Sequence, residues 1–87
     1  MLYLVNITKI DNAIKDISKN LGTNLKNASV ISIKFEFSPK TPLLDINDIM
    51  DFLCKEVSDN CEIIFNSKIN KKLLKEFCKY KITLIGI

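Results

Sequence analysis

The side chains that most often carry out chemistry in proteins are absent from this sequence or lack a partner in it. It contains no His, so the usual general base near neutral pH is missing. The three cysteines, Cys54, Cys61 and Cys78, have neither CxxC spacing nor the histidines that complete a Cys/His zinc site. We expect buried, reduced thiols that form no disulfide, with a reactive thiol as the alternative.

The acidic residues and the glycines form no catalytic or phosphate-binding pattern. Two acidic pairs fall on the polar faces and first turns of expected helices, where carboxylates are solvated and favour the helix dipole. These pairs are Asp48 with Asp51 and Asp11 with Asp16. The two glycines, Gly22 and Gly86, are far apart, so no loop offers successive amides to a phosphate. The sequence therefore predicts no enzyme activity, no metal site and no cofactor.

The basic residues are all lysines, and six of them are concentrated in one segment. Because Arg is absent, the planar group that grips phosphate or guanine at two points is missing, and we expect no specific nucleic-acid partner. The lysine patch consists of Lys68, Lys71, Lys72, Lys75, Lys79 and Lys81. It could dock an acidic protein surface, a phosphate-bearing ligand or anionic lipid, and the lack of Arg and of flanking aromatic residues favours an acidic protein. The alternative is a solvated helix face.

Length and composition indicate one small domain. The chain has 87 residues, 47% of them hydrophobic and 26% charged, as in an ordinary globular protein, and we assign residues 1–87 to a single domain. Its longest apolar runs are far shorter than the roughly 20 residues that a transmembrane helix needs. The first residues show neither the basic segment nor the cleavage site of a secretory signal. We expect a cytoplasmic protein without a transmembrane segment.

The first half of the chain reads as strand, helix, strand. Residues 2–7 form a short strand whose apolar side chains on both faces predict a place inside the sheet. An amphipathic helix follows, with Thr8 or Asp11 as its cap and Gly22 at its end. Its apolar positions are Ile10, Ala13, Ile14, Ile17 and Leu21. After a polar loop, residues 30–37 alternate strictly between apolar and polar, so one face of this strand meets water.

The second half reads as helix, strand, short helix, strand. A proline-containing break precedes a helix with Asp45 as its expected N-cap. The apolar positions of this helix are Ile46, Ile49, Met50, Leu53 and Val57. Residues 61–66 are a third strand and residues 81–87 a nearly wholly apolar fourth strand. Between them, a short helical segment is indicated by the spacing of Leu73, Leu74, Phe77 and Cys78.

These elements predict an α/β two-layer sandwich, of the α+β type, with a mixed four-stranded sheet in β-α-β-α-β-β order and both main helices on one face. The expected core is Leu4, Ile14, Ile17, Ile31, Ile33, Phe35, Ile49, Leu53, Ile63, Phe65 and Leu84. The uncovered face carries the candidate protein-interaction residues Ser32, Lys34, Glu36, Glu62 and Ile64. With Ile64 among them, this face is too apolar to be purely solvating, so something could cover it.

Several segments resemble the bacterial tubulin homologue FtsZ. Residues 61–70, CEIIFNSKIN, followed by ITLI at 82–85, resemble the NIIFGxxID and VTVI segments of that family. Ala28 with the strand at 30–37 and the helix start LLDINDI resembles its strand, loop and helix in the same order, and Leu2 to Leu21 fits the preceding strand and helix. The likeness covers almost the whole chain, as the family's C-terminal domain. Asn66 departs from it by replacing a glycine, the loop after Phe37 lacks the family's glycines, and the segment before the last strand is longer.

The resemblance implies a protein-interaction or assembly module, linked to cell division or to regulation of cytoskeletal filaments. The GTP-binding domain of the family would lie before Met1, so no GTP binding and no GTPase activity are expected. The implied partner is a protein, either a second copy of the chain or an FtsZ/tubulin-like protein. Two alternatives remain open. The chain also resembles the FtsZ-binding protein SepF, through its element order and the step Asp51-Phe52-Leu53, and it could instead be a small regulatory domain that senses an anionic ligand.

Overall fold

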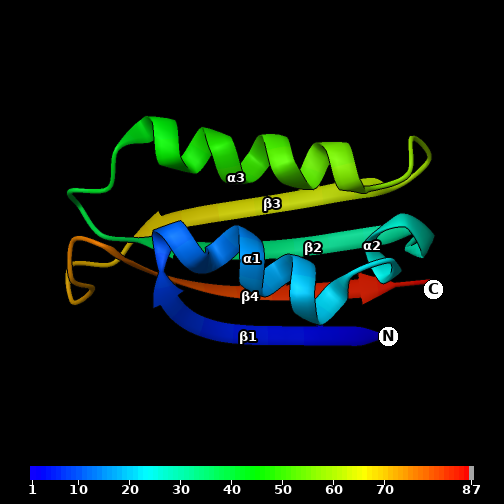
Figure 1. Ribbon diagram of the computed structural model, residues 1–87, viewed down its shortest axis with the longest axis horizontal. Helices are drawn as coiled ribbons and strands as arrows, with labels where there is room; N and C mark the ends of the chain where they lie inside the picture. Colours follow the sequence, from blue (N-terminus) through cyan, green and yellow to red (C-terminus); the bar gives the residue numbers. More distant parts are fainter. Residues whose placement is uncertain (87) are drawn as a thin grey trace.

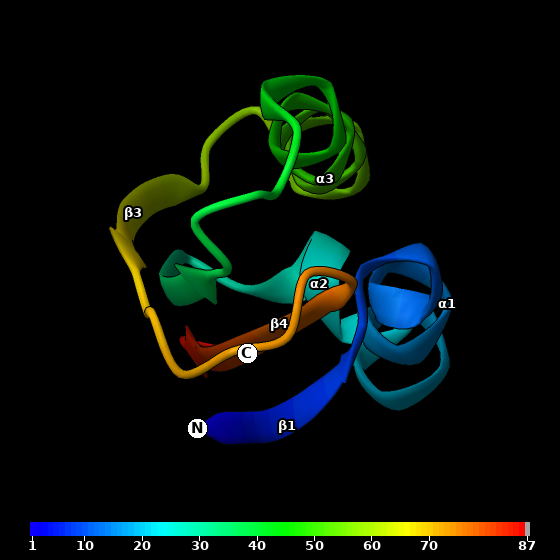
Figure 2. The same ribbon diagram turned by 90° about the vertical axis from the view of Figure 1, so that its left-hand side faces the viewer.

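Four strands and three helices in two layers make up residues 1–86, the part of the chain that the computed structural model describes. In chain order they are β1 (Leu2–Lys9), α1 (Ile10–Leu21), α2 (Asn24–Asn27), β2 (Val30–Phe37), α3 (Leu43–Glu56), β3 (Glu62–Ile69) and β4 (Phe77–Ile85). The strands form one sheet (Figure 1), and the end-on view in Figure 2 shows α1 and α3 on the same side of it. The predicted two-layer sandwich with its helices on one face is confirmed.

The sheet is mixed, with the strand order β1-β4-β2-β3. β2 and β3 are parallel neighbours joined through α3, whereas β4 runs antiparallel to both β1 and β2. The last strand therefore lies between the first and the second. Helix α1 passes over β4 to connect β1 with β2, and α3 connects β2 with β3. Each connection joins two parallel strands, which a tight turn cannot do, so each contains a helix.

Alternation along the two central strands separates a buried inner face from an exposed outer face. In β4 the inward residues Cys78, Tyr80, Ile82 and Leu84 are all buried. In β2 the buried positions are Ile31, Ile33, Phe35 and Phe37. The Phe35 ring stacks on that of Phe37, with centroids 5.2 Å apart, and lies 5.3 Å from the ring of Tyr80. These aromatic contacts form the centre of the core, because offset and tilted ring pairs add to the gain from burial.

The helices cover the inner face with the apolar stripes that the sequence predicts. Helix α1 buries Ala13, Ile17 and Leu21, and α3 buries Ile49 and Leu53. Of the eleven expected core residues, seven are buried; the other four, which are partly buried and pack against this core, are Leu4, Ile14, Ile63 and Phe65. The core prediction is thus confirmed. Burial of a large aliphatic or aromatic side chain contributes about 1.5 to 3 kcal/mol, so these positions dominate the stability of the fold.

The predicted helix caps are wrong at both helix starts. Helix α3 begins at Leu43 and is preceded by Pro42, whose φ of −63° is already close to the helical value. Asp45 therefore lies in the first turn and does not cap it. Helix α1 follows Lys9 directly, and no side chain caps it. At its other end Gly22 closes α1 as predicted: its φ is +47°, and its N–H donates to the Ser18 carbonyl oxygen at 3.0 Å.

The predicted short helix before the last strand is absent, and turns occupy residues 71–76 in its place. Asn70 explains the difference. Its N–H donates to the Phe37 carbonyl at 2.8 Å, its Oδ1 accepts the Lys72 N–H at 2.9 Å, and its carbonyl accepts the Leu73 N–H at 3.1 Å. An Asn that bonds the backbone ahead of it starts a turn in competition with a helix. β4 consequently begins at Phe77, earlier than predicted, and the predicted end of this strand at Ile87 lies outside the described residues.

Strand β1 is an edge strand, so the prediction that it lies inside the sheet is wrong. Its outward side chains Tyr3, Val5 and Ile7 are exposed and not covered. Apolar residues on both faces of a strand indicate burial on both sides only when other elements supply the cover, and here α1 covers the inner face alone. The polar loop expected after α1 also contains a short helix, α2, which buries Leu25.

Two of the three cysteines are less buried than predicted. Cys54 is exposed on α3 and Cys61 is half-buried before β3, whereas Cys78 is buried in β4. All three thiols are free. Cys54 falls outside the apolar stripe of α3, so the helical period itself places it toward solvent. β3 also runs from Glu62 to Ile69, beginning one residue later and ending three residues later than the predicted strand.

Candidate protein-interaction surface

The five predicted interaction residues lie together on the outer face, the side of the sheet opposite α1 and α3. In β2, Ser32, Lys34 and Glu36 alternate with the buried aromatic and aliphatic residues. Ser32 is directly opposite Ile64 of β3 in the ladder, and Glu62 lies two residues before Ile64 in the same strand. The outward residues of β1 and β4 complete this face: Tyr3, Val5, Ile7, Lys79, Lys81, Thr83 and Ile85.

An apolar stripe runs along one side of the outer face. It consists of Tyr3, Val5 and Ile7 on β1, which are 58%, 49% and 55% exposed. Single exposed apolar residues are ordinary, but three in a row on one strand make a continuous patch, which is typical of contact surfaces. The sequence alone did not predict this stripe, because apolar residues on both faces of β1 indicate that both faces are buried. The apolar residues themselves are visible in the sequence, but only the strand order shows that their outward side is uncovered.

A pair of lysines lies at the centre of the outer face. Lys34 of β2 and Lys81 of β4 are directly opposite each other in the antiparallel ladder. Like charges in this position are destabilising, so something must offset their repulsion. Lys81 extends toward β1, where its Nζ lies 5.1 Å from the centre of the Tyr3 ring, a favourable cation–π contact.

The nearest carboxylate does not neutralise this lysine pair. Glu36 lies between Lys79 of β4 and Lys68 of β3 in the ladders, and its Oε1 accepts a hydrogen bond from Asn70 Nδ2 at 2.8 Å. Its carboxylate is thus bonded to an amide and lies beside two other lysines in the ladders. The centre of the outer face keeps an excess of positive charge, which attracts an acidic group.

Two shallow depressions flank Lys34 and Glu36. One has a volume of about 360 Å³, and its lining consists of Tyr3, Val5, Lys34, Glu36, Lys79, Tyr80 and Lys81. The other, of about 320 Å³, is lined by Lys34, Phe35, Glu36, Asn66, Ser67 and Lys68. Depressions of this kind, with an apolar wall and charged residues beside it, suit protruding side chains of a partner protein.

The predicted lysine patch is divided by the structure. Lys79 and Lys81 lie on the outer face beside the predicted interaction residues, and Lys68 lies near the end of β3. The remaining three, Lys71, Lys72 and Lys75, lie in the turns between β3 and β4. The expected helix face does not form, so the patch is not one surface. Half of it instead adds positive charge to the predicted interaction surface.

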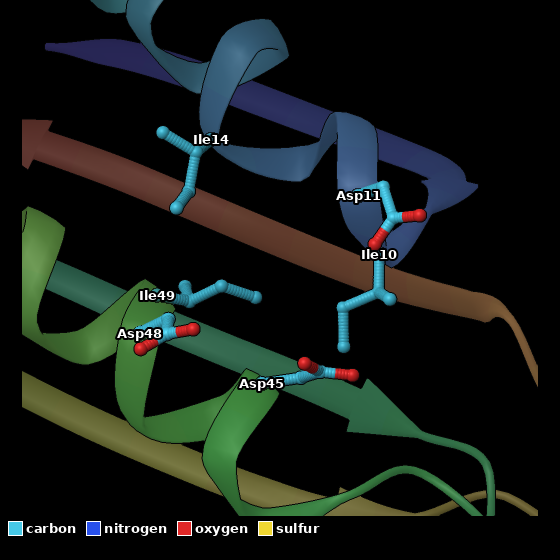
Figure 3. A pocket seen from close by; sticks show the side chains of 6 residues that line it. All are labelled: Ile10, Asp11, Ile14, Asp45, Asp48 and Ile49. Atoms are coloured by element: carbon cyan, nitrogen blue, oxygen red, sulfur yellow. The ribbon is translucent and has the colours of Figure 1, made fainter.

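A groove between the starts of α1 and α3 shows a different character (Figure 3). Its volume is about 210 Å³, and it is lined by Ile10, Asp11, Ile14, Asp45, Asp48 and Ile49. Isoleucine side chains from both helices meet there, with the three carboxylates at its rim. Within residues 1–86, no group of three His, Cys, Asp or Glu side chains is arranged to hold a metal ion. The carboxylates lie in or next to the first turns of the helices, where they favour the helix dipole.

A polar network on the inner side joins α1 to two strands. The Tyr80 hydroxyl donates to Asp16 Oδ2, Asn6 Nδ2 donates to the same oxygen at 2.9 Å, and Asn20 Nδ2 donates to Asp16 Oδ1 at 2.9 Å. Burial is the largest cause that raises the pKa of Tyr80, and the hydrogen bond to Asp16 is the second. Burial, with a smaller effect of the Asp16 charge, raises the pKa of Cys78 to about 11. Neither group is therefore a nucleophile near neutral pH, and the network is structural.

Comparisons with known proteins identify the fold. No family model matches the sequence, and no curated protein matches it. Among solved structures, two structures of FtsZ have a similar fold. A point mutant of FtsZ from M. jannaschii matches with a TM-score of 0.74 and 13% identity, and an empty FtsZ dimer from M. jannaschii with 0.71 and 15%. Each match covers 98% of this chain and 27% of the FtsZ chain.

The chain thus has the fold of the FtsZ C-terminal domain, as the sequence resemblance predicts. It spans 27% of the length of the FtsZ chains that it matches. The segment of FtsZ that it resembles does not include the GTPase site of that protein. Within the described residues, none of the helices is both long enough and apolar enough to span a bilayer.

Proposed function

We propose that this chain is a non-enzymatic protein-interaction or assembly module whose outer face binds a protein partner. The partner is an FtsZ/tubulin-like protein or a second copy of the chain, and the setting is the cytoplasm, in cell division or in the regulation of filaments. The observation that carries the proposal is the outer face itself. It places the apolar stripe of Tyr3, Val5 and Ile7 beside the uncompensated pair Lys34 and Lys81.

The composition of the outer face defines what the partner presents to it. An acidic side chain fits between Lys34 and Lys81, because within the described residues the neighbouring carboxylate, Glu36, is opposite Lys79 and bonded to Asn70. Apolar side chains fit against the stripe on β1 and in the neighbouring depression of about 360 Å³. A partner surface with an acidic residue flanked by apolar ones is therefore complementary to both the lysine pair and the apolar stripe.

The similarity to FtsZ supports a protein partner over other classes. The matched segment is 27% of an FtsZ chain, so in FtsZ a domain of this fold belongs to a much larger protein. One of the matched structures is a dimer of FtsZ. Contacts between domains of one protein resemble contacts between separate proteins, so a domain of this fold has faces of a size that a protein partner can occupy.

Titration with an FtsZ-like protein of the same organism tests the proposal. We expect saturable binding in calorimetry, and at least a tenfold loss of affinity for the double variant Lys34→Glu/Lys81→Glu, as is common when a charge contact reverses. The matched control is Lys15→Glu/Lys19→Glu, which changes two exposed lysines on α1 by the same charge. Equal binding by the two double variants would contradict the assignment of the outer face. The absence of both partner binding and self-association would refute the module itself.

The lysine pair also favours a second candidate, a regulatory domain that senses an anionic ligand. Lys34, Lys79 and Lys81 line one depression, and a phosphate-bearing metabolite would meet all three there. A thermal-shift screen with nucleotides and phosphorylated metabolites separates the candidates. A specific ligand at 100 times its Kd adds about 2.7 kcal/mol of stability. Stabilisation that Lys34→Thr abolishes would support the sensor, and a silent screen would favour the protein partner.

A further inference from the structure

Strand β1 leaves a complete backbone edge open along one side of the sheet. It is eight residues long, and no described element lies beyond it (Figure 1). At least one of its amides shows the lack of a neighbouring strand, since the Ile7 N–H donates to Oδ1 of the adjacent Asn6 side chain at 2.9 Å. An edge strand with free N–H and C=O groups is a template for a further strand.

Apart from Asn6, whose Oδ1 would have to release the Ile7 N–H on pairing, the side chains of β1 do not protect this edge. From Leu2 to Thr8 it carries no charge, and it contains no proline, glycine or residue with positive φ. These are the devices with which proteins block strand edges. Four of the ten large hydrophobic residues that are exposed belong to this part of the chain: Met1, Tyr3, Val5 and Ile7.

We propose that β1 pairs with β1 of a second copy of this chain, antiparallel and in register at Val5, so that two four-stranded sheets become one eight-stranded sheet. The inference rests on the proposed function in one respect, that the chain assembles with protein. The inference goes beyond the proposed function by naming the contact surface, the partner and the register of the pairing. A two-fold axis perpendicular to the sheet produces this arrangement, and it leaves the outer faces of both copies on the same side.

The residue pattern of β1 is complementary to itself in this register. Val5 lies opposite Val5 of the second copy, and Tyr3 lies opposite Ile7 of the second copy, twice by symmetry. An aromatic residue opposite a β-branched one is a favourable cross-strand pair. Lys9, the single charged residue of β1, lies opposite Met1 and far from its own symmetry mate. The pairing therefore extends the apolar stripe into one continuous patch and keeps the two Lys9 side chains far apart.

Stacking two outer faces against each other is the competing arrangement for two copies, and charge disfavours it. Lys34, Lys68, Lys79 and Lys81 exceed Glu36 and Glu62 on this face, so stacking would bury an excess of positive charge. The opposite edge of the sheet is also a poor site for strand addition. Its strand β3 carries Glu62 and Lys68 and the polar residues Asn66 and Ser67. The two edges thus differ: β3 also exposes Ile64 and Ile69, but the polar residues Asn66, Ser67 and Lys68 separate them. Pairing at β1 therefore closes a dimer and leaves the more polar edge free.

The size of the contact predicts a reversible dimer. Pairing along one strand of eight residues extends about 27 Å and buries less than the roughly 1,200 Å² of standard protein interfaces. We therefore expect dissociation in the micromolar range, with the outer-face lysines left free for another partner in the dimer.

Sedimentation over a range of concentrations tests the inference. The wild-type chain should rise from 9.9 kDa toward twice that mass as the concentration increases. Val5→Lys should remain a monomer, because a charge at the centre of the contact is repelled by its symmetry mate. Ile64→Lys is the matched control on the other edge strand: Ile64 is 44% exposed and Val5 49%, and this variant should dimerise as the wild type does. A monomeric wild type, or equal dimers of Val5→Lys, would overturn the inference.

Cross-linking tests the register and does not depend on a destabilising charge. In a background with Cys54→Ser and Cys61→Ser, oxidation of Val5→Cys should give a disulfide-linked dimer, because the Cα atoms of directly opposite residues are about 5.5 Å apart, a separation that a disulfide spans. Tyr3→Cys alone should not cross-link, since the two copies of this position are about 14 Å apart, but a mixture of Tyr3→Cys and Ile7→Cys should. Cross-linking of Ile64→Cys at the same rate as Val5→Cys would indicate random collision and contradict the pairing.

The outcomes distinguish this inference from the proposed function. A dimer that survives Val5→Lys and is lost in Lys34→Glu/Lys81→Glu would leave an assembly module that uses its outer face and would refute the edge pairing. A monomeric chain that binds an FtsZ-like protein would likewise support the interaction module and refute the edge pairing. Dimerisation through β1 without any FtsZ-like partner would support the edge pairing and confine the module to self-assembly.

Discussion

The two faces of the sheet are made by the same strands and have opposite physical roles. In β2 the residues Ile33 and Phe35 are wholly buried against the helices, and their neighbours Lys34 and Glu36 project to the other side. On the inner face Asn6 and Tyr80 donate hydrogen bonds to Asp16, whereas the outer face keeps an unbalanced charge and an apolar stripe. Residues one step apart in sequence therefore contribute either to the stability of the core or to the proposed interaction surface, and substitutions can separate the two.

The largest expected effect tests the inner face. Phe35→Ala removes a ring that contacts Phe37, Phe65 and Tyr80 and leaves a cavity, which should lower the free energy of unfolding by roughly 3 to 5 kcal/mol. Ser32→Ala, on the outer side of the same strand, is the control and should change stability by less than about 0.5 kcal/mol. Urea unfolding measures both. An unchanged midpoint for Phe35→Ala would contradict its place in the core.

The buried thiol of Cys78 makes stability depend on alkaline pH. The pKa of this thiol is about 11 in the folded chain and 9.0 in a model thiol. Between these values the unfolded chain releases a proton that the folded chain retains, so the free energy of unfolding falls as pH rises. The contribution is complete below pH 9 and its loss amounts to roughly 2 to 3 kcal/mol near pH 11.

Urea unfolding from pH 7 to 11 measures this loss, with two cysteine variants as references. Cys78→Ala should lack the component that begins near pH 9, whereas Cys54→Ala, which changes an exposed thiol, should retain it. The raised pKa of Tyr80 adds a further loss of stability above pH 10, by the same sign argument, in all three proteins. Identical pH dependence in Cys78→Ala and wild type would contradict the buried, neutral thiol.

The polar network at Tyr80 gives a smaller effect. Tyr80→Phe removes the hydroxyl that donates to Asp16 and keeps the ring in the core, so we expect a loss of about 1.5 to 2 kcal/mol, as for a hydrogen bond to a charged group. The double-mutant cycle with Asp16→Asn should show coupling between the two changes. Additive losses would mean that the hydroxyl and the carboxylate do not stabilise each other.

The smallest expected effect has the opposite sign and tests the outer face. Lys34→Thr removes one of two like charges that face each other across β2 and β4, and Thr suits a strand, so stability should increase by roughly 0.2 to 1 kcal/mol. The gain should shrink in high salt, because exposed charges are screened. A loss of stability in low salt would show that Lys34 has a stabilising contact within the chain. Partner binding by the same variant should weaken, which separates recognition from stability.

Periodicity in the sequence predicted the core and most of the elements because each strand and helix buries one face. The strict alternation of residues 30–37 gave the bounds of β2, and the apolar positions of α1 gave its buried stripe. The same alternation placed Ser32, Lys34 and Glu36 on the open face. In these elements the local pattern of apolar residues coincides with burial, so the sequence alone predicts which face is buried.

The remaining errors concern features that a local pattern does not determine. The spacing of Leu73, Leu74, Phe77 and Cys78 suits a helix, but the bonds of Asn70 start a turn, and the alternation from Cys78 to Leu84 extends the strand backward. The edge position of β1 depends on β4, about 75 residues later, entering the sheet beside it. Long-range strand order of this kind has no local signature, so the apolar stripe and its open edge emerged only from the structure.

The strand order also has a consequence for how the chain reaches its fold. β4 is the last strand, yet it pairs with both β1 and β2, and Leu2 lies opposite Leu84 at the other end of the chain. β2, α3 and β3 can associate early as a local parallel unit, but β1 has no neighbour until β4 has been synthesised and inserted. Closing so large a loop costs entropy before any contact compensates for it, and folding rates fall as contacts become more distant in sequence. β4 insertion is therefore the expected rate-limiting step, and until it occurs the uncharged segment from Leu2 to Thr8 has both edges open to aggregation.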